Sequence, residues 1–186
     1  MDIESLFPLI CEIKDDNLKE ITKKALVKAI KLGKWTESEV HNLPFTLLIP
    51  ELIKENKKPL ISLIDHINAV TRSSLNVYSV YIDLKLNDKL NKDYIISGAL
   101  LHDVGKFVEY QKDSTGKIVQ SQAGKTLRHP AQGLEIVAEF DFPLAVRQAI
   151  VFHSKEGKEI NLLPEVEIIS RSDFLCFVPV KKILQN

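Results

Sequence analysis

An adjacent pair, His102-Asp103, lies at the end of an apolar segment in the run Gly-Ala-Leu-Leu-His-Asp-Val-Gly-Lys. The pair offers an imidazole nitrogen and a carboxylate oxygen at one point of the chain, and both are good ligands for a divalent first-row metal. The chain has five histidines, and three more of them lie at helix-sized intervals from the pair. The full series of candidate ligands is His66, His102, Asp103, His129, His153 and Asp173.

The segments around these candidates have the apolar periodicity of buried helix faces. His66 shares a stripe with Leu63 and Val70, because residues three and four apart are neighbours on a helix. Asp173 has apolar neighbours, which are poor surroundings for an unpaired carboxylate but good ones for a metal-bound carboxylate. For that reason we prefer it to other acidic residues nearby. We expect six side chains from five helices to converge inside a bundle.

The apolar spacing predicts the helices that must position the candidates. They are expected over about 59–86, 94–103, 130–140, 143–153 and 164–177, and the last three each begin at a proline, which a first helical turn tolerates. The turn residues Asp113 to Gly116 separate two short runs and predict a small β-hairpin. Towards the N-terminus, a helix over 17–32 is expected to end at Gly33, and Thr36 to Glu39 reads as a capping box.

These elements predict an all-α fold with a small β-hairpin insertion. Residues 1–57 are expected to form an N-terminal helical extension, and residues 58–180 a metal-binding domain. A length of 186 residues suits one well-packed domain. Cys11 and Cys176 form no Cys-x-x-Cys pattern, and we expect both to be buried as small hydrophobic residues.

Composition argues against several classes of protein. Lys plus Arg equals Asp plus Glu at 25 each, so the formal net charge is zero and gives no broad attraction to nucleic acid or to anionic membranes. The N-terminus lacks the basic and apolar regions of a signal peptide, and no uncharged run approaches the roughly 20 residues of a membrane helix. We therefore expect a cytoplasmic protein that binds neither nucleic acid nor membrane.

The order His…His-Asp…His…His…Asp resembles that of the HD-domain superfamily of metal-dependent phosphohydrolases. His-Asp-Val-Gly-Lys looks like the motif for which that family is named, and the match covers about residues 60–178. The resemblance implies an HD-domain helical bundle with two metal ions and a bridging Asp103. One ion is expected at His66, His102, Asp103 and Asp173, and the second at Asp103, His129 and His153.

Simple charge arithmetic supports two ions. Two divalent ions bring four positive charges and two carboxylates remove two, so the remaining charge can hold a hydroxide and an anionic phosphate. Mixed imidazole and carboxylate ligation suits Fe, Mn, Co, Ni or Zn better than Mg or Ca. We expect Asp103 and Lys106 to be catalytic. Lys106, one turn beyond His102, and Arg128, beside His129, are candidates for contact with a substrate phosphate.

The predicted function is hydrolysis of a phosphomonoester or phosphodiester, nucleotide-derived, by a hydroxide activated at the dinuclear site. The expected partner is a small phosphorylated substrate, and a homo-oligomer is compatible with the sequence. No Gly-Tyr-Pro motif follows His153, which argues against a cyclic-dinucleotide phosphodiesterase. Two alternatives stay open: an HD-type di-iron oxygenase, and a binding or signalling module that keeps a metal without turnover.

Overall fold

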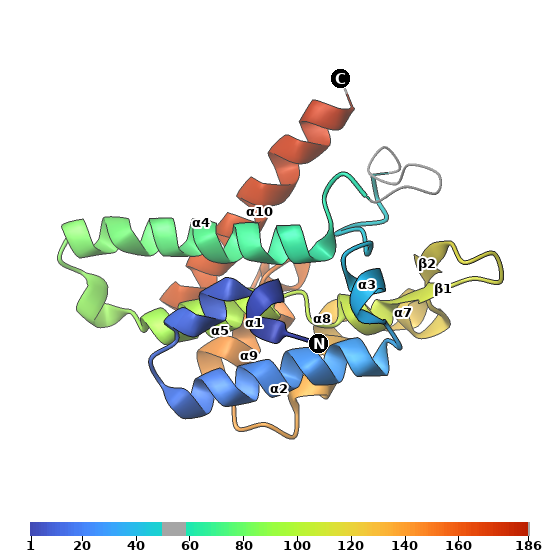
Figure 1. Ribbon diagram of the computed structural model, residues 1–186. Helices are drawn as coiled ribbons and strands as arrows, with labels where there is room; N and C mark the ends of the chain where they lie inside the picture. Colours follow the sequence, from blue (N-terminus) through green and yellow to red (C-terminus); the bar gives the residue numbers. More distant parts are fainter. Residues whose placement is uncertain (50–58, 186) are drawn as a thin grey trace.

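Helix α5 (Lys92–Leu101) is the central element of the fold, and every residue from Ile95 to Leu101 is buried. The computed structural model describes residues 1–49 and 59–185. Within them α5 lies between α4 and α2 and also packs against α9 and α10 (Figure 1). These helices span α2 Asp16–Leu32, α4 Leu63–Asp83, α9 Leu144–Phe152 and α10 Pro164–Leu184. A helix buried on all sides can carry ligands into the interior of the bundle.

The remaining elements are short. The helices are α1 Ile3–Leu6, α3 Glu37–Val40, α6 Lys106–Glu109, α7 Gln122–Thr126 and α8 His129–Val137. The 3₁₀ turns are η1 Pro8–Glu12, η3 Asn87–Lys89 and η4 Lys155–Gly157. The strands β1 Tyr110–Lys112 and β2 Ile118–Gln120 pair antiparallel, as the turn residues predicted. The predicted all-α fold class is confirmed, with this hairpin as the only sheet of the described residues.

The predicted start of α4 near residue 59 is wrong by about one turn, because a capping box sets the true start. The Ser62 hydroxyl accepts a hydrogen bond from the Asp65 backbone N–H, and the Asp65 carboxylate accepts one from the Ser62 N–H. This reciprocal pair satisfies two donors that a helix start leaves free. At the other end of the chain, α10 continues well past the predicted residue 177 and contains Pro179.

The N-terminal segment belongs to the same hydrophobic core as the helices that carry the candidate ligands. Its predicted helix is α2, which ends at Gly33, and the capping box of Thr36 and Glu39 is present. Ile10 and Leu26 share one buried cluster with Ile67 and Leu100. The predicted domain boundary between residues 57 and 58 lies outside the described residues.

Cys11 corrects one expectation from the sequence. It is exposed, because η1 turns Leu9 and Ile10 towards the core instead, while Cys176 is only half-buried. No helix of the described residues is both long enough and apolar enough to cross a membrane.

A close backbone approach joins the turn after α5 to the start of α8. A Cβ atom on Gly105 would lie 2.0 Å from the His129 carbonyl oxygen and 2.7 Å from the Gly133 nitrogen. Both contacts are with backbone, which cannot rotate away as a side chain could. Only glycine lets the segment that follows His102-Asp103 lie directly against the segment that carries His129.

The variant Gly105→Ala should therefore lower the free energy of unfolding by about 1–3 kcal/mol, the usual cost of overpacking. Urea denaturation measures the change. Gly116→Ala is the matched control, because its site is open but its φ of 84° strains an alanine. Its loss should be the smaller one, and equal losses in the two variants would contradict the close approach.

Candidate metal centre

The six predicted ligands meet at one place, although five different helices supply them. His66 lies inside α4, and His102 caps the C-terminal end of α5 with Asp103 directly after it. The rest come from the start of α8, the C-terminal end of α9 and the middle of α10: His129, His153 and Asp173. All are buried except Asp173, whose side chain is 15% exposed. His41, outside the series, lies exposed at the end of α3.

One carboxylate oxygen of Asp103 faces the first pair of histidines. Its Oδ2 atom lies 3.5 Å from His66 Nε2 and 3.4 Å from His102 Nε2. Asp173 closes the same group, since its Oδ1 atom lies 3.0 Å from His66 Nε2 and 3.9 Å from His102 Nε2. We call these four side chains the first half of the centre.

The other carboxylate oxygen of Asp103 faces a second pair of histidines. Its Oδ1 atom lies 3.2 Å from His129 Nε2 and 3.6 Å from His153 Nε2, and the two nitrogens are 3.4 Å apart. We call Asp103, His129 and His153 the second half. Ligands about 2.1 Å from one ion lie roughly 3.0–3.4 Å from each other, so the spacing in both halves suits a divalent metal.

Two buried polar atoms support this fit. His102 Nε2 and Asp103 Oδ1 have no hydrogen-bond partner among the described residues. Such atoms are rare in folded proteins unless a water or an ion satisfies them. Both lie in the groups of buried ligand atoms that could hold a metal ion, one group in each half.

Hydrogen bonds from the far ring nitrogens orient two of the imidazoles. His102 Nδ1 lies 2.6 Å from the Ala99 carbonyl oxygen, and His153 Nδ1 lies 3.0 Å from that of Ala149. A carbonyl only accepts, so Nδ1–H donates to it and Nε2 keeps a free lone pair directed into the centre. Metal-binding histidines are fixed in this way in many proteins.

Glu109 orients His129, and nothing in the sequence marked it for that role. Its Oε2 atom accepts from both the His129 backbone N–H and His129 Nδ1, each at 2.9 Å. Burial raises the pKa of Glu109, but the hydrogen bonds and charge of His129, together with the hydrogen bond from Gln120, outweigh burial and lower this pKa. Glu109 therefore stays charged, and its hydrogen bond to Nδ1 fixes the orientation of the His129 imidazole.

Opposing electrostatic effects keep the carboxylates of the centre ionised. Burial raises the pKa of Asp103, but the charges of Lys106 and His102, together with the contacts from His102 and His153, outweigh burial and hold this pKa well below its usual range. Burial likewise raises the pKa of Asp173, but the hydrogen bond from His66 and the charges of the neighbouring histidines together lower it to about 2. Anionic carboxylates are the form that binds a metal.

The surroundings of the imidazoles shift their pKa values in different directions. Burial lowers the pKa of His66 and of His129, which favours the neutral, metal-binding form. Burial also lowers the pKa of His102, but the contacts with Asp103, the charge of Asp173 and the hydrogen bond to the Ala99 carbonyl together outweigh burial and raise this pKa.

Lys106 contacts Asp103 directly instead of pointing to solvent. Its Nζ atom donates to Asp103 Oδ2 at 2.7 Å and to the Phe45 carbonyl oxygen at 2.8 Å. Arg128 pairs with Glu156, which also accepts a hydrogen bond from Ser154. Lys106 and Arg128 both line the cavity described next.

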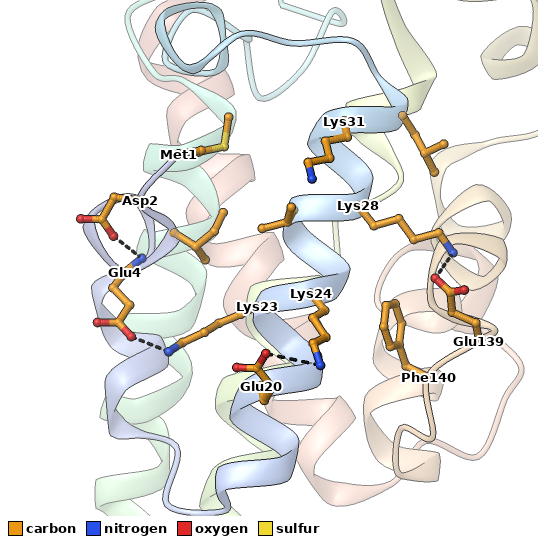
Figure 2. A pocket seen from close by; sticks show the side chains of 13 residues that line it. Met1, Asp2, Glu4, Glu20, Lys23, Lys24, Lys28, Lys31, Glu139 and Phe140 are labelled. Carbon is orange, nitrogen blue, oxygen red and sulfur yellow. Dashed lines mark hydrogen bonds and ion pairs between the residues drawn. The ribbon is translucent and has the colours of Figure 1, made fainter.

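A cavity of about 320 Å³ opens over the centre. All the candidate ligands except His102, which is fully buried behind them, line this cavity. A larger hollow of about 730 Å³ lies elsewhere, between α1 and α2 (Figure 2). No histidine lines it, and three of its lysines are paired with Glu4, Glu20 and Glu139. The smaller cavity is therefore the candidate substrate site.

Comparison with known proteins identifies the family. The HD domain family model matches residues 71–176, more than half of the chain, so the chain belongs to the HD domain family. This confirms the resemblance seen in the sequence. The matched segment includes every candidate ligand except His66, which lies just before it.

One curated relative is the dihydroneopterin 2',3'-cyclic phosphate phosphodiesterase of Methanocaldococcus jannaschii. It is 27% identical over 152 residues, which cover 81% of this chain and 59% of the relative. The chain therefore spans less than two thirds of that relative's length. No solved structure matches the chain. The family and the relative both support the prediction of a metal-dependent phosphohydrolase.

The support that Glu109 gives to His129 can be tested by removing its charge. Glu109→Gln should weaken the binding of a divalent ion at the second half by about 10–100-fold, the usual effect of losing such a partner. Titration of metal-free protein with Mn²⁺, followed by calorimetry, measures the affinity. Glu135→Gln makes the same chemical change at an exposed position of α8 and should keep wild-type affinity. Equal affinities in the two variants would contradict the assigned role.

Proposed function

We propose that this protein hydrolyses a phosphate ester with two divalent metal ions, one in each half of the centre. His66, His102, Asp103 and Asp173 would hold the first ion, and Asp103, His129 and His153 the second. The observation that carries the proposal is the division of Asp103, whose two oxygens face different pairs of imidazoles. A carboxylate that faces two ligand groups in this way is suited to bridge two ions.

A phosphodiester is the better-supported substrate. The M. jannaschii relative is named for a cyclic phosphate diester attached to a heterocycle, which fits the prediction of a small nucleotide-derived substrate. A cavity of about 320 Å³ suits a molecule of that size. The ligand types favour Fe, Mn, Co, Ni or Zn over Mg or Ca.

The bound ions would lower the pKa of a water molecule and neutralise the charge of the phosphate. The protein's own residues would hold and position the ions. Asp103 would fix the spacing of the two ions, while the buried histidines hold them without adding charge. The centre would thus keep two net positive charges to attract an anionic ester.

Lys106 is the residue that would respond most directly to the ions. Its ammonium group pairs with Asp103 Oδ2, which lies in the first half. An ion bound to that oxygen would compete with Lys106 and free it to contact a phosphate oxygen in the cavity. Arg128, on the side of His129, would supply a second cation if it exchanged Glu156 for the substrate.

The first experiment is elemental analysis of protein purified without added metal, followed by a panel of phosphate monoesters and diesters assayed with Mn²⁺, Co²⁺, Ni²⁺ and Fe²⁺. We expect metal-dependent release of phosphate or opening of a cyclic diester. A mixed-valent di-iron centre that consumes oxygen would instead support the oxygenase alternative. Tight binding of an ester without turnover would support a binding module.

Ligand substitutions distinguish the shared carboxylate from the others. Asp103→Ala should lose both ions, because each half would lose a ligand and the negative charge between the ions. His129→Ala should lose mainly one equivalent, since the first half remains intact. Inductively coupled plasma mass spectrometry of purified protein measures both.

The control for these variants is His41→Ala, which removes the exposed histidine outside the centre. It should retain the wild-type metal content. An Asp103→Ala protein that is folded by circular dichroism and still holds both ions would refute the bridging role.

A further inference from the structure

The cavity over the metal centre has an aromatic side formed by Phe45, Phe174 and Phe177. Phe174 directly follows Asp173 on α10, and Phe177 lies about one turn further on. The Phe45 ring stacks on His66 with centroids 4.7 Å apart and planes 24° apart. It also meets the Phe177 ring edge-on at 5.9 Å. The aromatic side of the cavity therefore lies beside the first half of the centre.

Cationic side chains of the cavity lie beside the second half of the centre. Arg128 directly precedes His129, and Ser154 and Lys155 directly follow His153. All three line the cavity together with Lys106. Arg128 is paired with Glu156, whereas no ion pair is found for Lys155 within the described parts of the chain. Lys106 lies on the other side, where its Nζ atom contacts Asp103 Oδ2 and the Phe45 carbonyl oxygen. The three rings thus lie beside the first half, and Arg128 and Lys155 lie beside the second half.

The rings on the aromatic side are not equally buried. Phe45 is 1% exposed and stacks on His66, whereas Phe174 is 40% exposed. A large exposed ring beside a buried ionic centre can gain free energy by stacking against another flat ring. Proteins that bind single-stranded nucleic acid stack aromatic side chains on its bases, and the stacking tolerates different bases because every base has a flat face.

We propose that Phe174 and Phe177 are specificity-determining residues that stack on a flat heterocycle carried by the alcohol part of the ester. The phosphate would then direct its free oxygens towards Arg128 and Lys155, and the alcohol part of the ester would lie towards α10. This inference rests on the proposed hydrolase function and adds the orientation of the substrate and its chemical class.

The test compares esters that share one reactive phosphate and differ only in the ring. One pair is a nucleoside 2',3'-cyclic phosphate and the same ribose cyclic phosphate without its base. A second pair is a nucleoside 5'-monophosphate and ribose 5-phosphate. With Mn²⁺-loaded wild-type protein, kcat/KM for the ring-bearing member of the hydrolysed pair should be at least about tenfold higher.

Phe174→Leu keeps an apolar side chain but removes the ring, and should reduce this ratio to about threefold or less. Phe174→Tyr restores a ring and should restore the ratio. Leu175→Ala is the matched control, because Leu175 is the next residue on α10, is 62% exposed and does not line the cavity. It should keep the wild-type ratio.

Different results would count against the stacking role of Phe174 and Phe177 and against the proposed hydrolase function. A wild-type protein that hydrolyses both members of a pair equally well would overturn the inference while leaving the hydrolase function standing. So would a Phe174→Leu protein that keeps the full ratio. Failure of the wild type to hydrolyse any of the four esters would overturn both.

Discussion

The buried carboxylate of Asp103 is the constraint on which the rest of the structure depends. It is 1% exposed, and a buried unpaired charge costs several kcal/mol, so cations or strong donors must surround it. In the structure Lys106 and the Nε2 atoms of His66 and His102 face Oδ2, and the Nε2 atoms of His129 and His153 face Oδ1. Every helix that carries a ligand must therefore reach the same point at the end of α5. Metal ions would satisfy the same requirement and would leave Lys106 free.

Small residues make that convergence sterically possible. A Cβ atom on Gly98 would lie 2.8 Å from the Ile169 side chain and 3.1 Å from that of Ala149. Gly98 therefore lets α9 and α10 lie close to α5 one turn before His102. Gly105 does the same for α8 on the other side of Asp103. His102 and Asp103 lie between these two close helix contacts. A side chain larger than glycine at either position would push the helices apart and widen the centre.

The six candidate ligands could be predicted from the sequence because the helices that carry them have a clear apolar period, as the helix of His66 has at Leu63 and Val70. Glu109 and Phe45 could not be found that way. Each acts through contacts with residues distant in the chain, and neither spacing nor residue type predicts such contacts. The start of α4 was misplaced for a different reason. The start depends on the pairing of the Ser62 and Asp65 side chains with each other's backbone N–H, which apolar spacing does not predict.

The two halves of the centre differ in charge, and this difference bears on how an ester would lie across them. The first half has two carboxylates at ligand distance, Asp103 and Asp173, whereas the second has only the shared Asp103. Glu109 bonds to the far nitrogen of His129 and so acts at longer range. An ion in the second half would keep more of its positive charge. That half also lies beside Arg128, so the charge distribution and the neighbouring side chains favour the same position for the phosphate.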